Sequence, residues 1–109
     1  MAISIIVADD NRLFRQGLIA QLQQYEDIIV IGEATNGKEA LLLVEELKPD
    51  VLVLDLQMPL LNGYEVMEQL RIRKPEMKIL VISSFVEEWH LSRVLEYGAS
   101  GCLSKDADT

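Results

Sequence analysis

A run of four apolar residues that ends in an acid limits the folds open to this chain. The run, Val51 to Leu54, lies between Pro49-Asp50 and Met58-Pro59, and Asp55 follows it directly. Its length, its two valines and its proline flanks predict a short strand buried on both faces, as strands are in a parallel sheet. Open parallel sheets bind ligands outside the carboxyl ends of their strands, so Asp55 lies where a site is expected. Asp is also a common turn residue, and that interpretation stays open at this point.

The rest of the chain alternates between strand-like and helix-like segments. Apolar runs predict further strands at 3–8, 28–32, 78–83 and 101–104. Helices are expected after Asn11, Asn36 and Asn62, each of which can cap a helix, and from Glu87 to Tyr97. Five strands alternating with four helices predict an α/β fold with a doubly wound parallel sheet and helices on both faces.

Each predicted helix has an apolar stripe at helical spacing, and the stripes are the surfaces expected to cover the sheet. In chain order, their members are Leu13, Phe14, Gly17, Leu18 and Leu22; Ala40, Leu41, Val44 and Leu47; Val66, Met67 and Leu70; and Leu91, Val94 and Leu95.

Composition restricts where the protein works and what it contacts. The sequence has 109 residues, 50% of them hydrophobic, which is enough for one domain with its own core. One cysteine and a first apolar run too short for a signal peptide predict a cytoplasmic protein without a membrane segment. The net charge of −8 disfavours direct binding of this segment to nucleic-acid phosphates.

Polar residues follow four of the five predicted strands. Asp9-Asp10 follows the first strand and Asp55 ends the third, while Ser83 ends the fourth and Lys105 follows the fifth. If the strands are parallel, these groups meet at one edge of the sheet. Carboxylates packed together repel one another unless a cation lies between them. Oxygen ligands without a nearby His or Cys favour a hard cation, most simply Mg²⁺.

These motifs resemble the receiver domain of bacterial two-component response regulators over nearly the whole chain. The resemblance rests on Asp9-Asp10, on Asp55 with Met58-Pro59 and Gly63 beyond it, on Ser83, and on the segment Gly98 to Lys105. It implies a flavodoxin-like (CheY-like) sheet with strand order 2-1-3-4-5. It also implies one receiver domain over residues 1–109 that stops before the family's fifth helix and carries no output domain.

The same resemblance implies the role of each site residue. Asp55 is expected to accept a phosphoryl group from a sensor histidine kinase or a small phosphodonor. Mg²⁺ would be bound by Asp10, Asp55 and the backbone carbonyl of Gln57, with Asp9 orienting a bound water as part of the metal site.

On the phosphoryl side of the site, Lys105 would pair with the phosphoryl oxygens and Ser83 would hydrogen-bond one of them. Ser83 would also act as the switch together with the residue at position 102, which in receivers is usually Tyr or Phe. Here that residue is Cys102, so the usual coupling between hydroxyl and aromatic ring is expected to be weak.

The ending Gly98 to Asp108 resembles the NarL/LuxR-type regulators, in which an acid follows the site lysine. Members of that group usually continue into a helix-turn-helix domain, so DNA would be bound only through a domain absent from this sequence. Without the fifth helix, an apolar face of the sheet is expected to be exposed and to drive formation of a homodimer.

Three other functions are weighed against this one. A phosphatase of the haloacid-dehalogenase type would need a second Asp at position 57, where this chain has Gln57. A nucleotide- or flavin-binding module would need a glycine-rich loop after the first strand, where Asp9 and Asp10 lie instead. A pseudo-receiver that only mediates protein contacts remains the alternative. As a receiver, the chain would be no enzyme beyond catalysing its own phosphorylation and dephosphorylation.

Overall fold

Five parallel strands form one sheet in the order β2-β1-β3-β4-β5, as predicted. The structure, a computed structural model, describes residues 2–73, 76–84 and 88–105. No helix within these ranges is long and apolar enough to cross a bilayer. The elements are β1 Ile3–Ala8, α1 Arg12–Leu22, β2 Ile28–Ala34, α2 Gly37–Leu47, β3 Val51–Asp55, α3 Gly63–Arg73, β4 Lys78–Ser83, α4 Glu88–Glu96 and β5 Gly101–Ser104.

The pairing register aligns the carboxyl ends of the central strands. Ala8 at the end of β1 pairs with Leu54 of β3. The last residue of β3, Asp55, pairs with Ile82 of β4, and Ser83 at the end of β4 pairs with Ser104 of β5. The residues that end or follow these four strands therefore lie along one edge of the sheet.

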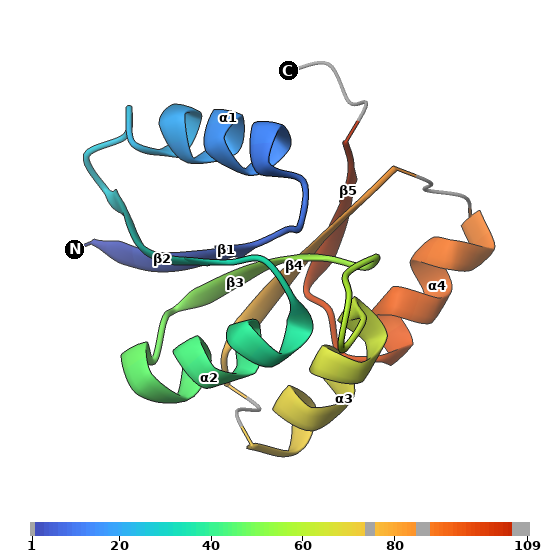
Figure 1. Cartoon of the computed structure of the whole chain (residues 1–109). Coiled ribbons are helices and arrows are strands. Elements are labelled where there is room, and N and C mark those ends of the chain that lie inside the picture. The colour runs from blue at the N-terminus through green and yellow to red at the C-terminus, as the bar shows by residue number, and fades with distance from the viewer. Residues whose placement is uncertain (1, 74–75, 85–87, 106–109) are drawn as a thin grey trace.

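The helices cover the two faces of the sheet unequally. Among the described helices, α1 alone lies on one face, and α2, α3 and α4 lie on the other (Figure 1). Alternate residues of β1 point to opposite faces, since Ile5 and Val7 belong to a small core cluster with Ile19 of α1, whereas Ile6 and Ala8 belong to the larger cluster. The larger cluster lies under α2 and α3.

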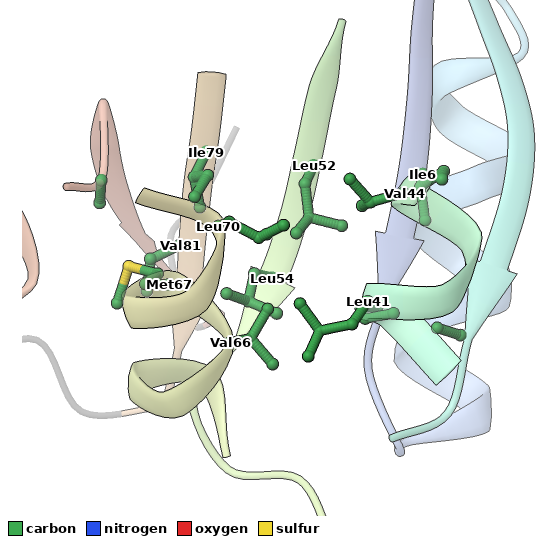
Figure 2. Close-up of a cluster of buried hydrophobic side chains, with 14 of the residues drawn as sticks. Ile6, Leu41, Val44, Leu52, Leu54, Val66, Met67, Leu70, Ile79 and Val81 are labelled. Carbon is green, nitrogen blue, oxygen red and sulfur yellow. The ribbon is translucent and has the colours of Figure 1, made fainter. Parts of the chain in front are cut away.

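Figure 2 shows how the larger cluster fills the space between the sheet and two helices. Leu52 and Leu54 of β3 meet side chains from α2 and α3, and Leu54 and Val66 are fully buried there. Burial of each aliphatic side chain of this size contributes about 1.5 to 3 kcal/mol. The strand that ends in Asp55 is therefore held by the larger of the two core clusters.

Asparagine caps fix the helix starts as the sequence predicts. The side chain of Asn11 accepts a hydrogen bond from the N–H of Phe14, and Asn36 accepts one from Glu39. Asn62 and Glu65 cap each other reciprocally. The predicted boundaries differ in two places, because β2 continues to Ala34 instead of ending at Gly32 and α4 ends at Glu96 instead of Tyr97. Glu87, the predicted start of the fourth helix, lies outside the described residues.

The predicted stripe of α1 is wrong in part. Leu13 is 86% exposed and Gly17 is also exposed, whereas Ile19 and the charged Arg15 are buried. Leu13 and Gly17 line an open groove of about 420 Å³ beside β5, together with Leu103, which is 52% exposed. Leu13 and Gly17 thus belong to an apolar stripe that no described element covers. Leu47 and Leu95, the last members of their stripes, are likewise partly exposed, and the side chain of Leu91 is not described.

Substitution of Gly63 by alanine should lower the free energy of unfolding by about 1 to 3 kcal/mol. A Cβ at this position would lie 2.7 Å from the carbonyl oxygen of Asp55 and 2.7 Å from the Cα of Leu56, so backbone would have to move. Gly17→Ala is the matched control because its Cβ meets nothing within 4 Å, and alanine favours a helix interior. Urea denaturation of both variants checks this, and an unchanged Gly63→Ala variant would contradict it.

Candidate functional site

Three carboxylates meet at the aligned strand ends. Asp9 follows β1, Asp10 is next to it, and Asp55 is the last residue of β3. One carboxylate oxygen from each of the three lies within 4.8 Å of the others. Asp9 is completely buried and Asp55 is 4% exposed, whereas Asp10 is exposed. The sequence predicts this convergence but not which member of the Asp9-Asp10 pair points inward.

The ammonium of Lys105 neutralises part of this charge. Its Nζ lies 2.9 Å from Oδ2 of Asp9 and 3.4 Å from Oδ2 of Asp55. The backbone N–H of Lys105 donates to the carbonyl of Ser83 at 2.8 Å, which ties the residue to the end of β4. Nζ also lies 4.8 Å from the centre of the Phe14 ring, within range of a cation–π contact.

The environment shifts the acidity of two of these groups. Burial, followed by the nearby charge of Asp9, raises the pKa of Asp55 from its ordinary 3.8 to about 6, although Lys105 and a backbone hydrogen bond from Gln57 oppose the rise. Burial alone would lower the pKa of Lys105, but its hydrogen bond to Asp9 and the charges of Asp55 and Asp9 together raise it. The site therefore carries more negative charge than one ammonium balances.

This set of groups fits a hard divalent cation. The donor atoms brought together by Asp9, Asp10 and Asp55 are all carboxylate oxygens, the ligands that Mg²⁺ and Ca²⁺ prefer. Within the described part of the chain, the Lys105 ammonium, 2.9 Å away, is the charge partner of the buried Oδ2 of Asp9. A cation would relieve the repulsion that remains between the carboxylates.

A cleft opens beside the cluster. Its volume is about 540 Å³, and it is lined by Asp10, Leu56, Gln57, Met58, Pro59, Asn62, Tyr64 and Ser83. Three of the predicted site residues, Asp10, Gln57 and Ser83, therefore lie on its walls. Cys102 does not line it; this half-buried residue pairs with Val81 in the sheet and packs against the larger core cluster.

Two residues near the site were assigned no role from the sequence. Arg15 of α1 is 7% exposed, and its Nη1 donates to the carbonyl of Asp9 at 2.8 Å. Tyr64 lines the cleft, and its ring makes an edge contact with Tyr97 at 5.0 Å between centroids and lies 4.6 Å from the guanidinium carbon of Arg93. No sequence signal identifies Arg15, because charged residues on amphipathic helices usually face solvent, whereas Tyr64 flanks the site in sequence.

The fold is thus a doubly wound parallel α/β domain in which carboxylates and a lysine meet at the strand ends. The family model for the response regulator receiver domain matches residues 5–109. The chain belongs to this family, as the sequence motifs predict.

Relatives and solved structures agree with this assignment. The chain is 40% identical to the transcriptional regulatory protein LnrK of Bacillus subtilis over 98% of its own length and 50% of that protein. It superposes on the receiver domain of NarL from Mycobacterium tuberculosis with a TM-score of 0.92 at 34% identity, covering 98% of this chain and 86% of that one.

A LuxR-family response regulator from Aurantimonas gives a TM-score of 0.93 at 28% identity, with 99% and 77% coverage of this chain and of that one. The resemblance to NarL/LuxR-type regulators is thus confirmed. The chain spans about half the length of the curated relatives that it matches.

Proposed function

We propose that Asp55 is the phosphoacceptor of this receiver and that the phosphoryl group comes from the histidine of a sensor kinase. The observation that supports this most is the buried Asp55 carboxylate beside the Lys105 ammonium, 3.4 Å away, with Asp9 and Asp10 within 4.8 Å. Mg²⁺ is the cation that we assign to the site, held by Asp10, Asp55 and the backbone carbonyl of Gln57, with Asp9 acting through a bound water.

The proposed transfer forms a bond between a carboxylate oxygen of Asp55 and phosphorus and breaks the bond between phosphorus and its donor atom. A carboxylate that approaches a phosphoryl group meets like charge, so positive charge must be in place beforehand. Lys105 supplies part of it, and a bound Mg²⁺ would supply the rest. Ser83 lines the same cleft and would donate a hydrogen bond to a phosphoryl oxygen.

The direct test is incubation with acetyl phosphate, with Mg²⁺ or with EDTA, followed by intact mass spectrometry. The wild type should gain one phosphoryl group only with Mg²⁺, and Asp55→Asn should gain none. Asp10→Ala should need more Mg²⁺ because it removes a metal ligand. Labelling in EDTA, or undiminished labelling of Asp55→Asn, would reject the assignment, and a wild type that never labels would favour a pseudo-receiver.

We further infer that residues 1–109 form the receiver part of a longer cytoplasmic transcription regulator. The curated relatives are about twice as long, and two of them, LnrK and DegU, are described as transcriptional regulatory proteins. DNA would then be bound by a separate helix-turn-helix domain, in keeping with the net charge of −8 on this segment. Phosphorylation of Asp55 would control that output through the 83–105 face, and any catalysis would be limited to the domain's own phosphorylation.

Phosphorylation should change the structure around α4 more than the structure around β5. Trp89 on α4 should therefore change its fluorescence. Cys102 has no ring that could move between buried and exposed positions when Ser83 moves, so the response should pass mainly to α4. Residues 85–87, between Ser83 and α4, and the side chain of Trp89 lie outside what the structure describes. Tryptophan emission before and after addition of the phosphoryl mimic beryllofluoride measures this, and constant emission with a large change at β5 would contradict it.

The isolated 109 residues should self-associate through the groove formed by α1 and β5. Leu13 and Leu103 expose apolar surface there, and buried apolar area contributes about 25 cal/mol per Å². Leu103→Glu should therefore shift a symmetric dimer to monomer in sedimentation velocity, while Leu42→Glu, at an exposed leucine of α2, should not. A wild type that stays monomeric at high concentration would contradict this.

A further inference from the structure

A buried arginine outside the acidic cluster holds the backbone from which two of its carboxylates extend. Arg15 lies in the first turns of α1, and its Nη1 donates to the carbonyl oxygen of Asp9 at 2.8 Å. Its Nε donates to Oε1 of Glu33 on β2 at 2.7 Å. The side chain of Gln16 donates to the same oxygen of Glu33 at 3.0 Å. One guanidinium thus joins a helix, a strand and the loop that follows β1.

The carbonyl that Arg15 holds belongs to the peptide group between Asp9 and Asp10. The orientation of this peptide sets the directions of both carboxylates, because each side chain starts at one of the two flanking Cα atoms. Two more hydrogen bonds hold the same loop: the N–H of Asp9 donates to Ala34 at 3.0 Å, and the N–H of Asn11 donates to Oδ1 of Asp9 at 2.9 Å. Arg15 supplies the charged donor in this set and is 7% exposed.

We propose that Arg15, anchored by Glu33, is a positioning residue that presets Asp9 and Asp10 for a divalent cation. The inference rests on the proposed function of the acidic cluster and adds a residue that the cluster itself does not contain. Groups that orient metal ligands without touching the metal commonly change affinity about 10- to 100-fold when removed. A planar guanidinium can hold a carbonyl and a carboxylate at once, which a lysine ammonium on a flexible chain does less well.

The test is a Mg²⁺ titration of the full 109-residue chain. The amide NMR signals of residues 8–11 report how much Mg²⁺ is bound at each step. Arg15→Met should bind Mg²⁺ about tenfold more weakly than the wild type. Arg15→Lys should recover only part of the loss, because it keeps the charge but not the two-sided contact. The matched control is Arg12→Met, which removes an exposed arginine from the same helix and should bind like the wild type.

The possible outcomes separate positioning from simple stabilisation and from a general effect of charge. A folded Arg15→Met variant that loses stability in EDTA but keeps wild-type Mg²⁺ affinity would overturn the proposal. An Arg15→Lys variant with full wild-type Mg²⁺ affinity would also overturn it. If Arg15→Met gives no native spectrum, the Glu33→Ala variant is used instead, because it removes the anchor and keeps the arginine. Glu33→Ala should weaken Mg²⁺ binding severalfold. Unchanged Mg²⁺ affinity in this variant would overturn the proposal.

A wild type whose amides do not respond to Mg²⁺ would instead refute the proposed function, and the role of Arg15 with it. Wild-type binding without an effect of Arg15 or Glu33 would leave the proposed function intact and refute this inference alone.

Discussion

Without divalent metal, the Asp55→Asn variant should be more stable than the wild type at neutral pH, by up to about 3 kcal/mol in the free energy of unfolding. The reason is the pKa of Asp55, which burial and Asp9 raise from 3.8 to about 6 in the folded protein. A tenfold change in an ionisation constant corresponds to about 1.4 kcal/mol. An amide at this position avoids the cost of holding a second buried negative charge beside Asp9.

The effect should depend on pH in a defined direction. Because the folded pKa lies above the unfolded one, protonation of Asp55 favours the folded state. That contribution is fully present below about pH 4 and is lost as pH rises through about 6, so the two proteins should converge in acid and separate towards neutrality. Urea denaturation in EDTA, from about pH 4 to neutral pH, measures the difference in free energy of unfolding between Asp55→Asn and the wild type. Asp27→Asn, at an exposed aspartate, is the control. A gap that is absent, or constant with pH, would contradict the assigned electrostatics.

Replacement of Lys105 by methionine should have the opposite effect and destabilise the metal-free protein by about 3 kcal/mol. Lys105 lies 2.9 Å from the fully buried carboxylate of Asp9 and 3.4 Å from that of Asp55. Removal of one partner leaves a buried charge without compensation, which costs far more than loss of a surface pair.

Thermal and urea denaturation in EDTA would measure the loss in Lys105→Met. Lys38→Met, at an exposed lysine of α2, is the control and should change stability by less than about 0.5 kcal/mol. Saturating Mg²⁺ should restore part of the loss in Lys105→Met, because the cation replaces the missing positive charge. Equal stability of Lys105→Met and wild type in EDTA would show that the ammonium does not stabilise the cluster.

The sequence predicts the strands and the meeting of the charged strand-end residues well, because both follow from local patterns. Apolar runs such as Val51 to Leu54 have few alternatives to a buried strand, and the asparagine caps mark where helices begin. Once the strands are parallel, the ends of β1, β3, β4 and β5 must share an edge, so Asp9, Asp10, Asp55 and Lys105 converge without further information.

Features that depend on long-range partners could not be predicted in this way. Periodicity places Leu13 on an apolar stripe of α1 but does not show whether anything covers it, and it is 86% exposed. Arg15 lies inside because a carbonyl at residue 9 and a carboxylate on β2 both accept from it, and these partners are 6 and 18 residues away in sequence. A buried arginine on a helix has no local signature.

Reduction of the phosphorylated protein with borohydride tests most directly whether Asp55 carries the phosphoryl group. Borohydride converts an aspartyl phosphate into homoserine, and peptide mapping by mass spectrometry then identifies the modified position. After incubation with acetyl phosphate and Mg²⁺, homoserine should be found at position 55 and at no other aspartate. Homoserine at position 9 or 10, or phosphorylated protein with no homoserine at position 55, would contradict the assignment of Asp55 as the phosphoacceptor.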